Sequence, residues 1–520
     1  MMAPPVAGEK VPLRTTLGFL AMVLGLFMAI LDIQIVASSI RDIQAGISAS
    51  LDEISWVQTA YLIAEVVVIP LSGWLARLLS TRWLFVASAA GFTVMSVAAA
   101  FAWSVESMIV IRAVQGLFGG TMIPTVFAAI FRMFPKDRQT GATVLSGLVA
   151  TTAPTLGPIL GGWITQNYSW HWLFLINMFP GTLVVVAVTL LVDIDRPNLR
   201  LLRRIDYPGI IFAAIFLGTV EYVLEEGTRD DWFESERILT LTVIAGVTGA
   251  LFLWRELACR DPVIDLRAFR DRNFAIGCLY SFIIGVGLFG STFVLPLFLS
   301  SVRGYDSLQI GTVMMVTGAF QFLSGPLAGA LERRIDQRLM LALGLAVFAV
   351  GLWLNGQLTA EAGLAQLFLP QALRGFALMF CFLPITSLAL GRLPADEVNN
   401  ASGLYNLMRN LGGAIGIAGI NTIFERRFDL HYLHLAETVN AGGIGPEQAV
   451  SRLSTYLETQ LIDTGRSLSA ALKIVHGLMG REGTVMAYND VFMTMSGVFI
   501  VGLLVMPLVR KAPPTPEPAF

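Results

Sequence analysis

The sequence is poor in charge. Asp, Glu, Lys and Arg make up only 14% of its 520 residues, whereas an ordinary soluble domain carries about 25%. A soluble surface of this size would need more charge than that. The 35 basic and 37 acidic residues nearly cancel, so the chain lacks the positive field that attracts nucleic acid. Lysine occurs four times and never in a phosphate-binding loop, which excludes ATP hydrolysis at a Walker-type site.

Cysteine and catalytic constellations are scarce as well. Cys259, Cys278 and Cys381 are odd in number and far apart, so they predict no disulfide framework and are interpreted as isolated small apolar residues. We find no nucleophile–base arrangement and no metal-ligand set. We therefore expect no enzymatic activity, no cofactor and no bound metal.

Apolar residues are abundant, at 55% of the chain. They form continuous runs rather than alternating patterns, which excludes a membrane β-barrel and predicts a polytopic all-α membrane protein. The first run lacks a short apolar core followed by a cleavage site, so we expect it to span the membrane. At about 20 residues per span, we predict fourteen spans, near 15–38, 56–76, 83–103, 107–131, 141–163, 171–192, 207–226, 237–256, 274–300, 308–331, 339–357, 364–391, 401–424 and 487–509.

The distribution of basic residues predicts the orientation. If the N-terminus is cytoplasmic, the inner segments hold 22 of the 35 basic residues and the six short outer loops hold four. The long outer segment 425–486 holds six, which count for little because long segments translocate largely regardless of charge. We therefore expect both termini in the cytoplasm and 425–486 outside.

The chain contains an internal repeat. Residues 70–77 and 326–333 both fit P-L-x-G-x-L-x-R, at an offset of 256, and each is followed by an arginine, Arg82 or Arg338. Residues 112–116 correspond to 371–375 at an offset of 259. Span n thus resembles span n + 8, which predicts two parallel six-helix repeats with two additional helices between them, the plan of the major facilitator superfamily.

These boundaries divide the chain into a cytoplasmic N-terminus (1–14), an N-terminal six-helix bundle (15–195), a linker with the two inserted helices (196–260), a C-terminal bundle (261–510) and a cytoplasmic tail (511–520). We expect the inserted helices to lie beside the bundles, outside the central cavity. Residues 224–227 and 230–232 would form their acidic outer connection.

Several motifs resemble those of the fourteen-span drug:H⁺ antiporters of that superfamily, the EmrB/QacA type, over about residues 14–510. They are L-D-x-x-I-V at 31–36, R-x-x-Q-G at 112–116, A-P-x-x-G-P-x-x-G-G at 153–162, W-H-W-x-F-x-I-N at 170–177 and N-x-x-R-x-x-G-G at 406–413. The loop after span 2 departs from the family: Arg77 stands where an acid is usual, and Ser80 and Thr81 replace a glycine and a basic residue. The usual charge lock of the N-terminal half is therefore in doubt.

Charged residues inside the spans are expected to have a partner or a function, because inserting each charge into the membrane costs at least about 2.5–3.5 kcal/mol. A desolvated carboxyl can take up a proton near neutral pH, so Asp32 and Glu65 are candidate proton-coupling residues, with Arg112 positioning the acid. A structural ion pair between Asp32 and Arg112 is the alternative. Arg374 and Arg409 are expected to bind an anionic group or to pair across the halves, or else to serve packing.

The remaining candidate residues fall into two groups. The motif and gating group comprises Gly73, Arg77, Arg82, Gln115, Gly116, Pro154, Gly157, Pro158, Gly161, Gly162, Gly412 and Gly416. Within it, the glycines and the proline at 157–162 and the glycines at 412 and 416 are expected to form a tight, bent helix contact between the halves that limits proton leak, with generic close packing as the alternative. The candidate substrate-binding group, for which ordinary packing is again the alternative, comprises Met122, Phe293, Met315, Phe320, Gln321, Met379, Arg374, Asn406 and Arg409.

The resemblance implies a proton-coupled exporter of hydrophobic or amphipathic toxic compounds in the bacterial inner membrane. A dedicated exporter of one natural product or fatty acid, an importer, or a transporter-like receptor or lipid-handling protein are alternatives. The segment 425–486 is predicted to be helical, with helices near 449–461 and 467–479 that lie along the membrane surface or meet a partner. The resemblance makes a periplasmic adaptor and an outer-membrane channel plausible partners.

Overall fold

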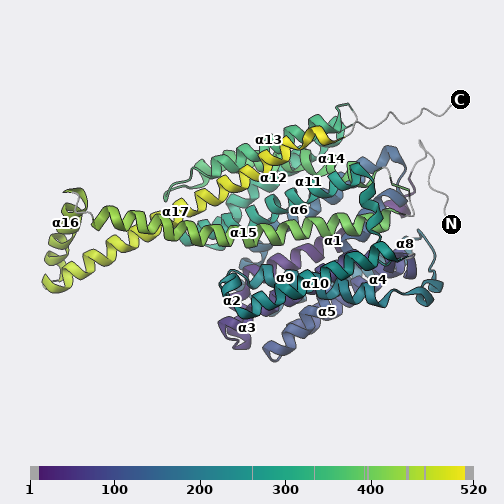
Figure 1. Ribbon diagram of the computed structural model, residues 1–520, viewed down its shortest axis with the longest axis horizontal. Helices are drawn as coiled ribbons and strands as arrows, with labels where there is room; N and C mark the ends of the chain where they lie inside the picture. The colour runs from purple at the N-terminus through teal and green to yellow at the C-terminus, as the bar shows by residue number, and fades with distance from the viewer. Residues whose placement is uncertain are drawn as a thin grey trace.

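A computed structural model describes residues 11–259, 262–332, 334–391, 393–394, 397–440, 444–461 and 464–509. Within these ranges all regular structure is helical (Figure 1). The α-helices are α1 (Leu13–Ser38), α2 (Ile40–Ile47), α3 (Leu51–Leu79), α4 (Thr81–Ala100), α5 (Val105–Met133), α6 (Lys136–Asn167), α7 (His171–Leu175), α8 (Met178–Leu191), α9 (Tyr207–Glu226), α10 (Glu236–Ala258), α11 (Arg272–Arg303), α12 (Ser307–Glu332), α13 (Gln337–Asn355), α14 (Leu364–Leu390), α15 (Val398–Asn440), α16 (Ile444–Leu461) and α17 (Thr464–Leu504).

Polar capping residues start several of these helices. Ser50 and Ser104 accept hydrogen bonds from the backbone three residues on and form capping boxes at α3 and α5. Asp206 and Asp271 cap α9 and α11 in the same way. Because these caps satisfy backbone N–H groups that the helix itself leaves free, they fix where each apolar run becomes a helix.

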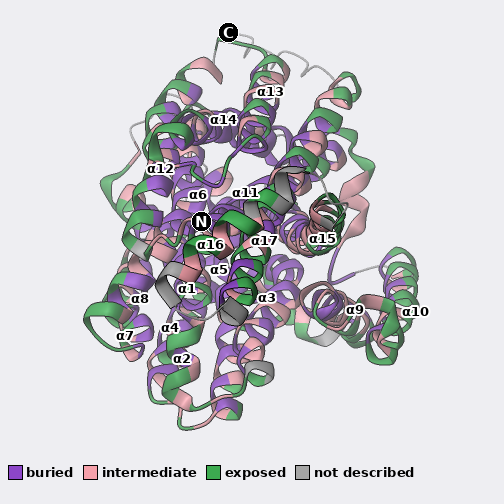
Figure 2. Ribbon diagram, turned by 90° about the vertical axis from the view of Figure 1, so that its left-hand side faces the viewer, coloured by how far each residue is buried: buried purple, intermediate pink, exposed green. Residues whose placement is uncertain are grey.

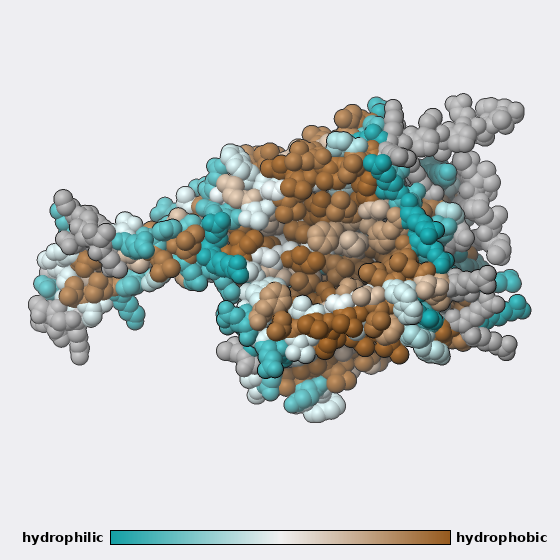
Figure 3. All heavy atoms as spheres, in the orientation of Figure 1, coloured by the Kyte–Doolittle hydropathy of each residue, from teal (hydrophilic) through white to brown (hydrophobic). Residues whose placement is uncertain are grey.

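Thirteen of the described helical spans are long and apolar enough to cross a membrane, and α15 is the fourteenth, lying among them in the bundle. Figure 3 shows a band of apolar side chains around the middle of the molecule, between polar ends. The predicted all-α architecture with fourteen spans is therefore confirmed.

The two halves repeat each other in space as they do in sequence. In the N-terminal half α1 packs on α6 and α8, and α5 packs on α3 and α4. In the C-terminal half α11 packs on α15 and α17, and α14 packs on α12 and α13. Between the halves α6 meets α12 and α3 meets α15. These contacts are related by the same exchange of span n for span n + 8 that the sequence repeat predicts.

The inserted helices lie on one flank of the bundle (Figure 2). α10 packs chiefly on α9, and α9 in turn packs on α3 and α15, one helix from each half. The expected position beside the bundles holds for α10, whereas α9 bridges the halves and reaches the cavity described below.

The segment 425–486 differs from its expected form. α15 continues to Asn440 and α17 begins at Thr464, so two helices of 43 and 41 residues project from the bundle and α16 packs on α17 near the tip (Figure 1). At 1.5 Å per residue each is about 60 Å long, twice the hydrocarbon thickness of a bilayer. The segment is helical as predicted, but the spans themselves extend without a break and project from the bundle, which is not the arrangement of helices lying along the membrane surface. The alternative, contact with a partner, stays a prediction.

For the description of the site, the end of the bundle at which α1 begins and α17 ends is the terminal end. The opposite end, from which α15 and α17 project, is the far end (Figure 1).

Candidate substrate cavity and coupling network

Asp32 lies at the centre of a buried polar network near the far end of α1. Its carboxylate accepts hydrogen bonds from Arg112 Nη1 of α5 at 2.5 Å, Asn177 Nδ2 at 2.9 Å and Gln115 Nε2 at 3.3 Å. Asn177 lies at the break between α7 and α8, and its side chain also donates to Ser96 Oγ at 3.0 Å. The interruption of the sixth span thus turns an amide toward the acid.

Aromatic rings enclose the other partner of this pair. The Arg112 guanidinium lies 4.3 Å from the ring centre of Tyr61 and 5.8 Å from that of Phe174. Its Nη1 also donates to Gln115 Oε1 at 2.8 Å. The side chains of Asp32 and Arg112 are both fully buried, so the ion pair that the sequence offered as the alternative interpretation is present. A role of the pair in proton coupling stays a prediction.

A cavity of about 180 Å³ lies between the halves, nearer the far end than the terminal end. Five of the seven helices that line it, α1, α3, α5, α6 and α9, precede the C-terminal half, and α11 and α15 belong to that half. The lining residues are Ile30, Ile33, Gln34, Ala37, Gln58, Leu62, Glu65, Val66, Ile123, Ala150, Glu221, Glu225, Leu288, Phe289, Phe293, Asn406, Arg409, Asn410, Gly413, Ala414 and Ile417.

Three carboxyls line this cavity. Glu65 comes from α3 and lies beside Asn410 of α15. Glu221 and Glu225 come from successive turns of α9. The expectation that the inserted helices stay outside the cavity is therefore wrong for α9. The prediction that residues 224–227 belong to an outer connection also fails, because α9 continues to Glu226.

Arg409 lines the cavity and is held by aromatic rings. Its guanidinium lies 4.5 Å from the ring centre of Phe382, 4.9 Å from Tyr405 and 5.4 Å from Phe127. Phe127 belongs to the N-terminal half, so Arg409 does contact the other half, through a ring. In the described part of the chain it forms no ion pair with a carboxylate.

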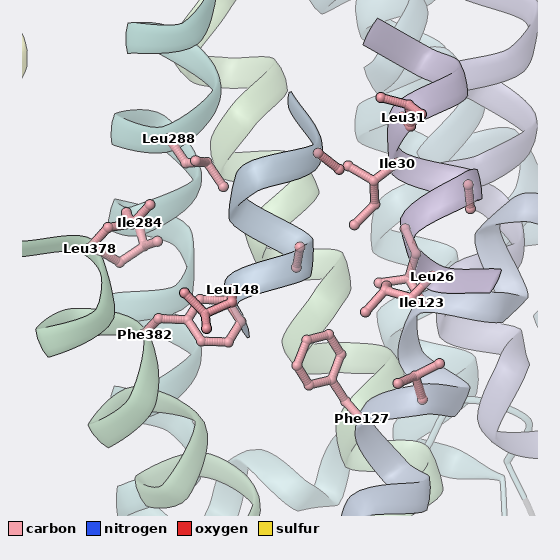
Figure 4. Packing of buried hydrophobic residues seen from close by; sticks show 14 of the residues in the cluster. Leu26, Ile30, Leu31, Ile123, Phe127, Leu148, Ile284, Leu288, Leu378 and Phe382 are labelled. Carbon is pink, nitrogen blue, oxygen red and sulfur yellow. The ribbon is translucent and has the colours of Figure 1, made fainter. Parts of the chain in front are cut away.

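Apolar side chains close the bundle between the cavity and the terminal end. The ring centres of Phe127, from the N-terminal half, and Phe382, from the C-terminal half, lie 5.9 Å apart, and Leu148 lies nearby (Figure 4). Ser402 Oγ of α15 donates to the Pro124 carbonyl of α5 at 2.7 Å. Gly73 is packed so closely against the backbone of Asn399 and Asn400 that a Cβ would not fit. The conformation therefore has its cavity toward the far end and a closed terminal end.

The motif glycines pack mainly within each half. Gly157 and Gly161 of α6 lie against α1, at Gln34 and Ser38, and a side chain at either position would overlap these residues. Gly412 and Gly416 of α15 lie against α11, at Phe282 and Val286, and Gly116 of α5 lies against Tyr61 of α3. The expectation of an interface between the halves is therefore wrong for the glycines of α6 and α15, whereas Gly73 of α3 does lie against the other half. Pro154 and Pro158 lie inside α6, and Gly162 is buried there.

A different charge lock replaces the usual one at the terminal end of the N-terminal half. Asp195 accepts hydrogen bonds from Thr81 N at 2.8 Å and Thr81 Oγ1 at 3.0 Å, and from Arg132 Nη1 at 2.9 Å. It thereby joins the start of α4 to the end of α5. Arg82 donates to the Thr189 carbonyl, whereas Arg77 is exposed. The sequence departure at Arg77 thus coincides with a lock built from other residues.

Three of the nine candidate substrate-binding residues line the cavity, namely Phe293, Asn406 and Arg409. The other six lie elsewhere: Met122 and Met379 are fully buried in packed layers, Gln321 is buried in α12, Arg374 bonds Gln371 inside the C-terminal half, Met315 is exposed, and Phe320 packs on Phe368. Sequence reasoning missed Gln34, Asn410, Glu221 and Glu225. The spacing of Glu221 and Glu225, four residues apart on an apolar helix, was the available signal for the last two.

Comparisons with known proteins agree with this arrangement. The family model "Major Facilitator Superfamily" matches residues 22–417. The "Colistin resistance protein EmrB" of Acinetobacter baumannii is 38% identical, with 93% of this chain and 94% of that protein covered. The "Multidrug export protein EmrB" of Escherichia coli K12 is 31% identical, covering 96% and 95%, and the "Fatty acid resistance protein FarB" of Neisseria gonorrhoeae is 30% identical, covering 98% of each.

Solved structures share the fold. The proton:xylose symporter XylE superposes with a TM-score of 0.62 at 10% identity, covering 96% of each chain. The human organic anion transporter MFSD10 gives 0.58 at 13% identity, covering 95% of this chain and all of that one. With helices, repeat and sequence in agreement, the chain belongs to the Major Facilitator Superfamily and, within it, to the family of EmrB-type transporters.

Proposed function

We propose that this protein exports hydrophobic or amphipathic toxic compounds by alternating access, driven by a proton gradient. The observation that carries the proposal is the cavity between the two halves, which combines apolar walls with the buried carboxyl of Glu65. The names of two relatives, a multidrug export protein and a colistin resistance protein, support the substrate class.

Coupling would use the buried carboxyls. Glu65 lines the cavity, so a proton entering from the far end meets it without crossing the closed terminal end. Asp32 lies outside the lining, paired with Arg112, and would respond to the cavity through α1, whose Gln34 lines it. Proton uptake by a carboxyl and substrate binding would then compete, so that the entry of a proton is exchanged for the release of substrate in one conformational cycle.

The test is transport in proteoliposomes with an acidic lumen. A substrate is first chosen by growing an efflux-deficient host that expresses the chain on a panel of dyes, uncouplers, detergents and fatty acids. Wild type should accumulate this substrate in the lumen, and the double variant Asp32→Asn, Glu65→Gln should not, whereas Asp32→Asn alone should still bind it. Glu234→Gln, which changes an exposed carboxyl, is the matched control. Uphill accumulation by the double variant would refute the assigned coupling residues.

We further propose the bacterial inner membrane as the location, with both termini cytoplasmic and the projecting helices in the periplasm, where an adaptor would bind them. A cysteine replacing the exposed Ser451 of α16 should react with an impermeant maleimide on intact spheroplasts. A cysteine replacing Lys136, at the terminal end, should react only after lysis. Reversed accessibility would overturn the orientation. The native Cys278 and Cys381 are buried, and Cys259 would first be replaced by serine.

A further inference from the structure

Glu221 is a buried carboxyl of the cavity wall that has no partner among the residues the structure describes. Its side chain is 3% exposed, and it belongs to the cavity lining. Its Oε2 atom has no hydrogen-bond partner among the described residues. An unpartnered buried oxygen is costly unless something supplied from elsewhere satisfies it.

The charged groups around Glu221 do not provide that partner. The charges that act on it are Glu225 on its own helix and Glu65 on α3, both acidic. In the described part of the chain none of these three carboxyls forms an ion pair. The remaining charge on the cavity wall is Arg409 of α15, which packs on the rings of Phe382, Tyr405 and Phe127. Its Nε and Nη2 atoms also have no hydrogen-bond partner among the described residues, so the wall carries three acidic side chains and one basic one.

The same cavity supplies aromatic faces. Phe289 and Phe293 of α11 line it together with the three carboxyls. Carboxylates and aromatic rings around one small space form the combination that binds organic ammonium groups, because the ring face attracts a cation and the carboxylate neutralises it.

We infer that Glu221, together with Glu65, binds the positively charged head group of an amphipathic organic cation, so that the inserted helix α9 determines the charge of the substrate. This inference rests on the proposed export function and names its substrate class. A neutral ligand can at most donate a hydrogen bond to Glu221 Oε2, a cation also balances the negative charge of the wall, and an anion would meet three carboxyls. The volume of about 180 Å³ accommodates an ammonium head group with one ring.

The test measures binding without any gradient. Tritiated benzyltrimethylammonium is titrated onto the purified full-length protein in a scintillation proximity assay. Its uncharged carbon analogue neopentylbenzene serves as competitor. We expect saturable binding that unlabelled cation displaces and the neutral analogue does not. Glu221→Gln should weaken it by about tenfold or more, as expected for loss of a charge-assisted contact. Glu234→Gln should leave it unchanged.

Several outcomes would overturn the inference: no saturable binding to wild type, equal competition by the neutral analogue, or an unchanged Kd in Glu221→Gln. If Glu221→Gln fails to fold, as judged by thermal unfolding, Glu65→Gln decides, and an unchanged Kd there would count against the site. Because no gradient is used, cation binding without proton-driven transport would refute only the proposed function. Transport with an unchanged cation affinity in Glu221→Gln would refute only this inference.

Discussion

Asp32 and Arg112 show how two charges are tolerated in the middle of a membrane bundle. Each is fully buried, and between them the pair uses donors and acceptors from α1, α5 and the break before α8. Removing one partner of such a pair costs about 3–5 kcal/mol, because the remaining charge is left uncompensated.

The first prediction concerns this pair. Asp32→Asn should lower thermal stability in detergent markedly, because it leaves the Arg112 guanidinium buried and unpaired. Adding Arg112→Gln should restore part of the loss. Thermal unfolding of the two single variants and the double variant forms a cycle that measures the coupling. Strictly additive losses would show that the pair does not interact as the structure has it.

A second prediction concerns Gly157, where α6 and α1 approach most closely. Gly157→Val should prevent correct packing because its side chain would overlap Gln34. Gly419→Val on α15 is the matched control, since no atom lies within 4 Å of a Cβ built at that position. Yield of monodisperse protein in size-exclusion chromatography measures the effect. Equal yields from both variants would contradict the close α1–α6 contact.

The position of a residue along its predicted span was enough to predict some site residues and not others. The positions of Asp32 and Arg112 along their spans place them at a similar depth, and the two side chains do form an ion pair. Glu221 and Glu225 were missed although the predicted span 207–226 contains both, because the inserted helices were expected to lie outside the cavity, whereas α9 lines it. Met315 and Met122 show the converse, because their residue type suggested a binding role but neither lines the cavity. Which side of a helix points toward the cavity decides whether a side chain reaches it, and a single sequence does not give this orientation.

At the scale of elements, the loop after α9 ties the inserted pair to both halves. Trp232 Nε1 donates to Thr422 Oγ1 of α15 at 2.9 Å, and Arg229 Nη1 donates to Ser55 Oγ of α3 at 3.0 Å. Thr59 of α3 also donates to Glu226 at 3.2 Å. The far end of the bundle is thus bridged by a segment that belongs to neither six-helix repeat.

A third prediction follows for this bridge. Thr422→Val removes the acceptor for Trp232 and should speed amide hydrogen exchange across residues 228–235 by up to about tenfold, the worth of one hydrogen bond. Thr219→Val, whose hydroxyl bonds only within its own helix, is the control. Unchanged exchange in Thr422→Val would show that the bridge is held by other contacts.

The order and pairing of the spans could be predicted because the offset between the repeats, 256–259 residues, is nearly constant. The extent of α15 and α17 could not. Residues 425–486 were predicted to contain separate helices because the apolar runs end at their borders, yet a helix that leaves the membrane needs no stop signal to continue in water. Contacts between the two helices support this extension: Phe424 packs on Tyr488 at 4.5 Å, and His431 bonds Asp490 at 2.9 Å.

At the scale of the whole molecule, a fourth prediction separates the projecting part from the transport core. Replacing residues 438–474 by a short Gly/Ser loop should leave gradient-driven uptake in proteoliposomes unchanged, because the cavity and both halves are untouched. If an adaptor binds the projection, the same variant should lose resistance in whole cells. Loss of uptake in proteoliposomes would show instead that the projection is part of the transport cycle.

α15 is one continuous helix that joins the cavity wall to the projecting tip. One uninterrupted helix carries Arg409 and Asn410 at the cavity wall and ends at Asn440, about 45 Å further along at 1.5 Å per residue. A rigid tilt of about 10° at the cavity would displace that end by about 8 Å, several times the movement at the substrate itself. A conformational change at the cavity would therefore move the tip of α15, beyond the membrane, further than it moves the cavity wall.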